Sequence, residues 1–189
     1  MSFFRTESRK YSSWFLVAIG LSLATIVSAS AIVYVKTASN TKFSIPNDVV
    51  IDKVFVIKSE RVLKLLSGDT VIKTYRIALG NNPVGHKQQE GDGRTPVGHY
   101  LLDYKNENSI AHRSIHVSYP NAADIAHAQS LGVSPGGDIM IHGQMNGFGH
   151  LAWFNQKRDW TEGCIAVTND EMDEIMAAVD VGTMIEIVE

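Results

Sequence analysis

The sequence predicts a mainly β domain with a few helices, preceded by one N-terminal transmembrane helix. Two observations support this prediction. An apolar run of 22 residues without a charge occupies positions 14–35. After residue 48, short apolar segments with partial period-two alternation are separated by Gly, Pro and polar turns.

The apolar run 14–35 is long enough to cross a bilayer as a helix, for which roughly 20 apolar residues suffice. Three basic residues and one acid precede it. Because positive charge beside a span stays in the cytoplasm, residues 1–13 are predicted to be cytoplasmic. The rest would then be periplasmic or otherwise extracytoplasmic, as in a single-pass inner-membrane protein. A cleaved signal peptide is the alternative, although its apolar core usually has only about 7–15 residues.

A polar linker is predicted at 36–48 and one domain at 49–189. After residue 35 the chain carries 14 basic and 19 acidic residues, a formal net charge of −5. Nucleic-acid-binding domains are basic, so no nucleic-acid partner is expected. The single cysteine, Cys164, allows no internal disulfide. In an exported domain it is either a buried inert thiol or a reactive group.

The predicted strands begin with a segment that places Val54, Val56 and Lys58 on one side. A hairpin turn is expected at 67–69. The strand-like segments are 53–59, 61–80 (two strands), 98–106, 114–120, 138–143, 164–168 and 183–189.

Two helices are predicted, at 121–132 and at 169–182, with Asn121 and Asn169 as their N-caps. The second has an apolar stripe formed by Met172, Ile175, Met176 and Val179. Between the strands, residues 81–98 are rich in Gly, Pro and polar residues. They predict a long loop of the kind that often carries function.

Cys164 and His142 form the candidate catalytic pair. A cysteine nucleophile reacts as the thiolate and needs a neighbouring base, usually histidine. Gly163 before the cysteine would let a substrate approach backbone N–H groups that stabilise an oxyanion. A backbone carbonyl could fix the tautomer of His142. A Cys and a His separated by 22 positions are, by themselves, a weak signal.

Three short motifs occur in a fixed order: Thr95-Pro96-Val97-Gly98, then His142-Gly143, then Thr161-Glu162-Gly163-Cys164. In this combination the chain resembles the L,D-transpeptidase catalytic domain family, the YkuD-type fold, over roughly residues 50–189. The resemblance implies a mostly β, sandwich-like fold and no cofactor. It also implies an extracytoplasmic enzyme that acts on peptidoglycan stem peptides.

The resemblance further implies roles for individual residues. Cys164 would attack the carbonyl of meso-diaminopimelate, and the resulting thioester would pass to an amine or to water. His142 would act as general base and acid, with the Gly143 carbonyl orienting its ring. The N–H groups of Gly163 and Cys164 would hold the oxyanion.

Two positions depart from the pattern of many family members. Glu162 stands where they have histidine, and Ala166 where they have arginine. The segment around Cys164 is closer to the YafK-like branch, which resembles hydrolases that release a wall-linked lipoprotein. Amine and water therefore both stay open as acceptors. By hypothesis, the negative charge of Glu162 favours the protonated form of His142.

Four further residues are predicted to bind substrate: Arg94, His116, Tyr119 and Thr161. The alternatives are a role in fixing the long loop for Arg94, a satisfied sheet histidine for His116 and ordinary packing for Tyr119. Two other functions remain open. One is a zinc-dependent peptidoglycan peptidase or amidase with ligands from His142, His150, His116 and Cys164. The other is a non-catalytic wall-binding module.

Overall fold

The computed structural model describes residues 45–46 and 48–189. The chain divides into two units, 1–43 and 44–189, and all described residues belong to the second. The predicted cytoplasmic segment, the predicted transmembrane helix and most of the predicted linker lie outside the described residues. Within the part that is described, no helix has the length and apolar character needed to cross a membrane.

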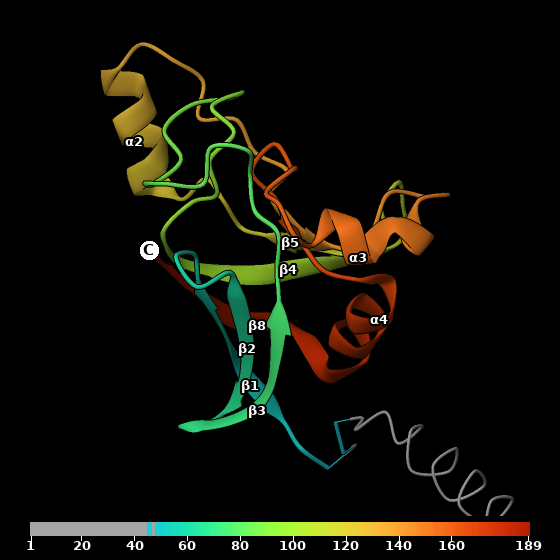
Figure 1. Ribbon diagram of the computed structural model, residues 1–189. Coiled ribbons are helices and arrows are strands. Elements are labelled where there is room, and N and C mark those ends of the chain that lie inside the picture. Colours follow the sequence, from blue (N-terminus) through green and yellow to red (C-terminus); the bar gives the residue numbers. More distant parts are fainter. Residues whose placement is uncertain (1–44, 47) are drawn as a thin grey trace, which may run out of the picture. The chain divides into compact units, whose positions relative to one another are not determined.

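Eight strands of the described unit form one sheet in the order β3-β2-β1-β8-β4-β5-β6-β7 (Figure 1). The pairs β1–β8 and β6–β7 are parallel, and the other neighbours are antiparallel. The strands are β1 (Ile51–Ile57), β2 (Val62–Ser67), β3 (Thr70–Arg76), β4 (Gly98–Ser109), β5 (His112–Val117), β6 (Met140–His142), β7 (Ile165–Ala166) and β8 (Val179–Val188).

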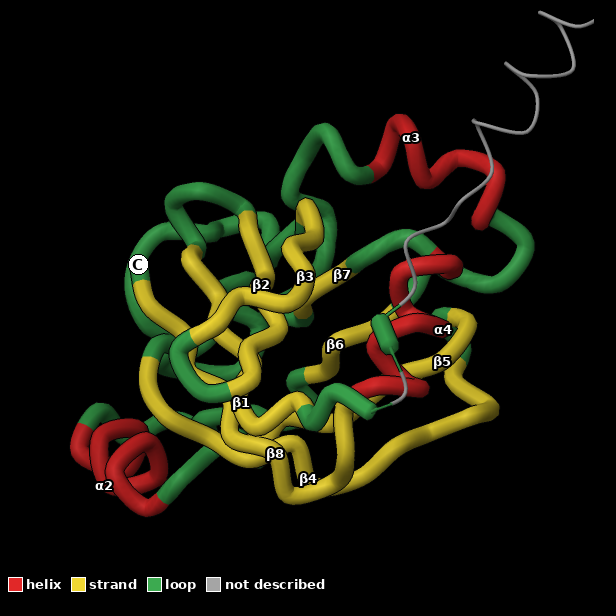
Figure 2. The backbone as a smooth tube through the Cα atoms, turned by 90° about the horizontal axis from the view of Figure 1, so that it is seen from below, coloured by secondary structure: helices red, strands yellow, loops and turns green. Residues whose placement is uncertain are grey.

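The sheet curls until its two ends meet. Ala78, which follows β3, and Ala166 on β7 exchange two backbone hydrogen bonds of 2.9 and 2.8 Å. Figure 2 shows β3 and β7 side by side. The mainly β prediction agrees with this fold, but the expected sandwich differs from it, because one sheet wraps around the core. Twist accumulates across the strands, and register shifts between β4 and β5 add local bends.

Side-chain alternation sends one face of each strand into the core. Val54, Val56 and Lys58 are all fully buried on one side of the first strand and its extension, as predicted. In the second half of the sheet, Ile115 on β5 pairs with Ile141 on β6, and Ile141 pairs with Ile165 on β7. All three isoleucines are fully buried. Burying such a side chain contributes about 1.5–3 kcal/mol, so this row fixes which face of the three strands points outward.

Helix α2 (Ala122–Ser130) begins at the predicted cap, with the Asn121 side chain accepting the N–H groups of Ala123 and Asp124. Helix α4 (Asn169–Ala178) is capped by Thr168, so the prediction of Asn169 as the cap is wrong. Thr168 has the extended backbone that a cap requires, and its side chain accepts the Glu171 N–H.

Helix α4 packs on β5, β6 and β8, and its predicted apolar stripe is buried. It ends at Ala178, and β8 follows directly from Val179. The strand is therefore longer than the predicted 183–189. Two short elements were not predicted, the 3₁₀ turn η1 (Gly149–Leu151) and helix α3 (Ala152–Asn155). Figure 1 shows α3 and α4 near each other and α2 apart from both.

Candidate active site

The register of β6 and β7 brings the two candidate catalytic residues to one face. Ile141 pairs with Ile165 and His142 with Ala166, and Cys164 immediately precedes β7. The Met140 N–H donates to the Cys164 sulfur at 3.4 Å, which holds the thiol beside the start of β6. Because neighbouring side chains alternate, His142 and Cys164 lie on the face opposite the buried isoleucines. They stand on adjacent strands, two residues apart in register.

The His142 ring is buried and held from two sides. Its Nδ1 lies 2.6 Å from the Gly143 carbonyl oxygen, which assigns the proton to Nδ1 and leaves Nε2 as the basic nitrogen. Its ring meets Trp160 edge to face, with centroids 5.7 Å apart. Burial lowers the pKa of His142, although the bond to Gly143 opposes this. The imidazole is therefore neutral around pH 7, as a general base requires.

The Cys164 thiol is partly buried, and its S–H points to the Asp138 carbonyl oxygen at 3.5 Å. Burial raises its pKa, and the charge of Asp138 acts in the same direction. The Met140 N–H and the charge of Lys87 lower the pKa. Since burial is the largest of these effects, the resting site holds a protonated thiol beside a neutral imidazole.

The loop before Cys164 is held in shape by Thr161. Its hydroxyl donates to the Cys164 carbonyl oxygen at 2.7 Å and accepts the Gly163 N–H at 3.2 Å. Thr161 thus shapes the loop from a buried position. Because the Gly163 N–H already has an acceptor, the Cys164 N–H is the better oxyanion donor. It has no hydrogen-bond acceptor in the described region.

Gly163 and Gly143 both occupy positions where a side chain would collide. At Gly163, φ is +128°, and a Cβ would lie 2.6 Å from the carbonyl oxygen of Arg94. At Gly143, a Cβ would lie 2.8 Å from Asn169 Oδ1 and 2.9 Å from His112 Cβ. The two glycines of the predicted motifs therefore allow close packing next to His142 and Cys164, the candidate catalytic pair.

Of the four predicted substrate-binding residues, His116 is the one that lies in a strand of the sheet. It faces Met140 across the β5–β6 ladder, so it shares the outer face with Cys164. Its Nδ1 lies 2.6 Å from Asp103 Oδ1, and its ring stacks on Tyr104 with centroids 4.6 Å apart. The register shift in β4 explains these two contacts, because it places both Asp103 and Tyr104 opposite His116.

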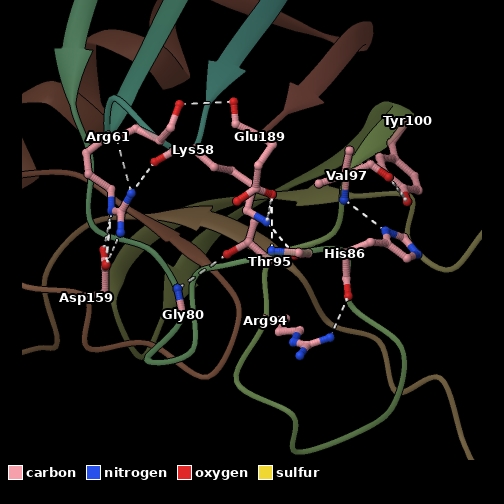
Figure 3. Close-up of polar contacts among 12 residues, drawn as sticks. Lys58, Arg61, Gly80, His86, Arg94, Thr95, Val97, Tyr100, Asp159 and Glu189 are labelled. Atoms are coloured by element: carbon pink, nitrogen blue, oxygen red, sulfur yellow. Dashed lines mark hydrogen bonds and ion pairs between the residues drawn. The ribbon is translucent and has the colours of Figure 1, made fainter.

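Tyr119 and Arg94 have mainly structural contacts. The buried Tyr119 hydroxyl donates to the Pro135 carbonyl oxygen at 2.9 Å, and burial raises its pKa. Arg94 Nη1 lies 3.5 Å from the His86 carbonyl oxygen, as Figure 3 shows. Its Nε is buried without a partner in the described region. The Arg94 side chain therefore contacts His86 within the same 81–97 loop. The Arg94 carbonyl oxygen packs against Gly163.

Comparison with known proteins decides the family. The sequence matches the L,D-transpeptidase catalytic domain family (YkuD) over residues 49–187. The chain belongs to this family. The L,D-transpeptidase domain is 30% identical over 131 residues to YafK of Escherichia coli (strain K12), whose own assignment as an L,D-transpeptidase is provisional. That alignment covers 66% of this chain and 45% of YafK, and it agrees with the predicted YafK-like branch.

Two solved structures share the fold. The helical cell shape determining protein Pgp2 from Campylobacter jejuni matches the L,D-transpeptidase domain with a TM-score of 0.57 at 26% identity, over 75% of this chain and 49% of Pgp2. Bdellovibrio bacteriovorus Bd1075 matches with a TM-score of 0.53 at 19% identity, over 77% and 50%. The chain thus spans about half the length of these relatives.

In the L,D-transpeptidase domain, the 81–97 loop and the Thr-Pro turn at 95–98 support the nucleophile loop. Thr95 Oγ1 accepts the Gly80 N–H at 3.3 Å (Figure 3). A Cβ on Gly80 would lie 2.0 Å from the Gly93 carbonyl oxygen and 3.0 Å from Gly163 Cα. The predicted motif residues Thr95 and Gly163 are therefore joined through Gly80, which sequence analysis did not single out.

His86 anchors the same loop to helix α2. Its Nδ1 accepts the Val97 N–H at 3.0 Å, and its Nε2 lies 3.1 Å from Asp124 Oδ1. Tyr100 donates to the other oxygen of Asp124 at 3.1 Å. The loop is thus held in place by a buried carboxylate that also caps α2.

The zinc alternative finds no ligand set in the L,D-transpeptidase domain. Over residues 45–46 and 48–189, no three His, Cys, Asp or Glu side chains are arranged to hold a metal ion. His142 and His116 each use Nδ1 for another contact.

Sequence reasoning missed two residues near Cys164: Lys87 and Asp138. Lys87 and Asp138 both act on the pKa of Cys164, and Trp160 packs on His142. Only Lys87 carried a recognisable signal, since it lies in the long loop before the Thr-Pro turn.

Proposed function

We propose that this domain is a cell-wall cysteine acyl-transfer enzyme that acts on the meso-diaminopimelate carbonyl of peptidoglycan stem peptides through a Cys164 thioester. The observation that carries the proposal is the β6–β7 register, which sets Cys164 and a buried neutral His142 on one face. Membership of the L,D-transpeptidase family supports peptidoglycan as the substrate.

The first half-reaction begins from the neutral pair. His142 Nε2 takes the thiol proton as the sulfur bonds to the carbonyl carbon, and the carbonyl oxygen becomes an oxyanion. The Cys164 N–H is placed to donate to that oxygen. When the tetrahedral species collapses, the C–N bond breaks and the leaving amine takes the proton from His142. A Cys164 thioester and a neutral amine remain.

The second half-reaction passes the acyl group to an acceptor. His142 Nε2 removes a proton from an amine or a water molecule as it attacks the thioester carbon. The C–S bond then breaks, and the proton returns to the sulfur. An amine gives a cross-link or a protein attachment. Water gives a free carboxylate, as in an amidase that releases a wall-linked lipoprotein. The YafK-like sequence around Cys164 keeps the hydrolytic outcome in the proposal.

The full-length protein, incubated with muropeptides and with lipoprotein-linked peptidoglycan in H₂¹⁸O, tests this proposal by mass spectrometry. Hydrolysis incorporates one ¹⁸O atom into the product, whereas amine transfer forms a new amide without ¹⁸O. We expect Cys164→Ser to lower turnover by about 10³-fold or more, as expected for loss of a catalytic nucleophile. An unchanged product set in Cys164→Ser would contradict the proposal, and full biological function in Cys164→Ala would favour a non-catalytic wall-binding module.

We also propose that residues 14–35 anchor the enzyme in the inner membrane, with residues 1–13 in the cytoplasm and the catalytic domain in the periplasm. The charge-free apolar run and the basic residues before it support this arrangement. Protease added to intact spheroplasts should digest the catalytic domain while the protein stays membrane-bound in alkaline carbonate. Protection from the protease, or release by carbonate, would refute it.

A further inference from the structure

The 81–97 loop contacts two segments that bracket Cys164. On one side, the Arg94 carbonyl oxygen packs closely against Gly163, the residue before Cys164. On the other side, the Glu90 N–H donates to the Ser134 carbonyl oxygen at 2.9 Å, and a Cβ on Gly136 would lie 3.1 Å from Glu90 Cα. This second segment continues to Asp138 and Met140, which contact the Cys164 sulfur.

Within this loop, Lys87 is buried, with 3% of its side chain exposed. Its ammonium donates to Asp92 Oδ1 at 2.9 Å and to the Gln89 carbonyl oxygen at 3.1 Å. Burying an ammonium is costly unless it is paired and hydrogen-bonded, and these two contacts supply the pairing. An ammonium has three N–H donors, so one remains beyond the two bonds to its own loop.

Asp92 is turned toward its own loop. Besides Lys87, its oxygens accept the backbone N–H groups of Gln88 at 2.7 Å, Gln89 at 3.2 Å and Arg94 at 3.0 Å. These bonds hold the pKa of Asp92 below its usual value against the opposing effect of burial. The carboxylate is thus saturated by loop donors, whereas the ammonium keeps one N–H beyond its bonds to Asp92 and Gln89.

The charged groups around Cys164 oppose one another. Lys87 favours the thiolate, whereas Asp138, on the segment before β6, disfavours it. His142 on β6 is neutral in the resting site. Glu162, in the loop of the nucleophile itself, accepts a hydrogen bond from Asn81 at 3.2 Å in an exposed position. Lys87 is therefore the cation of the described region whose charge favours ionisation of Cys164.

A second buried lysine offers a contrast. Lys58 is fully buried, donates to the Gly85 carbonyl oxygen at 2.5 Å and pairs with Glu189 at 3.0 Å (Figure 3). It fastens the same loop from the other end, and burial lowers its pKa. Both lysines are buried, paired and bound to a loop carbonyl. They differ in that the Lys87 ammonium binds Gln89 and Asp92, which lie on either side of Glu90 in the stretch of the loop that contacts both segments at Cys164.

We propose that Lys87 is a positioning residue of the active site, whose ammonium, oriented by Asp92, stabilises the Cys164 thiolate as it forms during attack. This inference rests on the function proposed above, in which Cys164 is the nucleophile. Lys87 acts through Cys164 and does not itself contact the reacting carbonyl. Its charge offsets part of the cost of ionising a thiol in a buried site.

The test is the pH dependence of Cys164 alkylation by iodoacetamide in the full chain, which requires no turnover. Lys87→Gln keeps a donor for Asp92 and Gln89 but removes the charge. We expect its alkylation curve to move to higher pH, with the rate at pH 7 falling by about three- to tenfold. Lys87→Arg keeps the charge and should titrate within about twofold of the wild type.

Lys58→Gln is the matched control, because it should lower the melting temperature without moving the alkylation curve. A Lys87→Gln curve that coincides with the wild-type curve would overturn the proposal. If Lys87→Gln does not fold, Asp92→Asn replaces it. Removal of the neutralising carboxylate should move the curve to lower pH, and an unmoved curve would again refute the role of Lys87. Failure of the proposed function would give a different result. In that case Cys164 of the wild-type protein would be alkylated as expected, but the protein would not turn over stem peptides.

Discussion

At the scale of residues, the neutral resting pair is the main feature of the site. Burial raises the pKa of Cys164 and lowers that of His142, so both effects oppose a preformed thiolate–imidazolium pair. The hypothesis that Glu162 favours a protonated His142 has no support in this geometry, because Glu162 is bonded to Asn81 at the surface. Ionisation of the thiol is therefore expected during attack on the substrate.

This resting state predicts two pH limits. Alkylation of Cys164 should rise with pH through a midpoint above the ordinary pKa of a cysteine, because only the thiolate reacts. The value of kcat/KM should fall in acid only below the ordinary histidine pKa of about 6.5, since the lowered pKa of His142 keeps its imidazole neutral to lower pH. Alkylation rates and kcat/KM measured from pH 4 to 10 check both limits. An alkylation midpoint near pH 6 would instead indicate a stable thiolate.

At the scale of elements, helix α2 is tied to the active-site loop through one side chain. Asp124 is buried, accepts the Asn121 N–H at 2.9 Å in the capping box, and binds both Tyr100 and His86. The helix and its Asn121 cap are predictable from sequence. The link to His86, 38 positions earlier, is not, because local patterns record no long-range partner.

We expect Asp124→Ala to lower the free energy of unfolding by about 2–4 kcal/mol, since it removes a cap contact and the carboxylate that both the buried Tyr100 hydroxyl and the partly exposed His86 ring bind. Urea unfolding of the full chain measures this change. Asp180→Ala, at an exposed carboxylate in β8, is the control and should change stability by less than about 0.5 kcal/mol. Equal effects of the two substitutions would show that the Asp124 network contributes little.

Capping of α4 shows the same limit of local reasoning. Thr168 and Asn169 are both good cap residues, so the sequence permits either. The tertiary structure decides for Thr168, because the Asn169 side chain accepts the Gln144 N–H at 2.8 Å. Asn169 thereby contacts Gly143 and Gln144, the two residues that follow His142.

At the scale of the whole molecule, the closure of the sheet limits the size and charge of the side chain at position 166. The pattern of the family has arginine at this position, where this chain has alanine. Ala166 is fully buried, pairs with His142 on β6, and bonds to Ala78 across the closure. In this chain the position is a packing site between the two ends of the sheet.

Ala166→Arg should therefore destabilise the fold. The substitution would force a large charged side chain into a fully buried position, at a cost of about 3 kcal/mol or more. Thermal unfolding measures the loss. The control is Ala177→Arg at an exposed position of α4, where little change is expected. A stable Ala166→Arg protein with higher turnover would instead show that the position can open to substrate.

The sequence by itself determined the family, most strands and the two longer helices, and it singled out Cys164 and His142 as the candidate catalytic pair, because motif identity and side-chain period are local properties. Only the tertiary structure decided how the sheet closes, which residue caps α4, and which charges act on Cys164. Strand alternation assigns a side chain to a face but does not name the neighbouring strand. A pKa depends on burial and on charges brought together by folding, so the neutral catalytic pair and Lys87 had no signature in the motifs around Cys164.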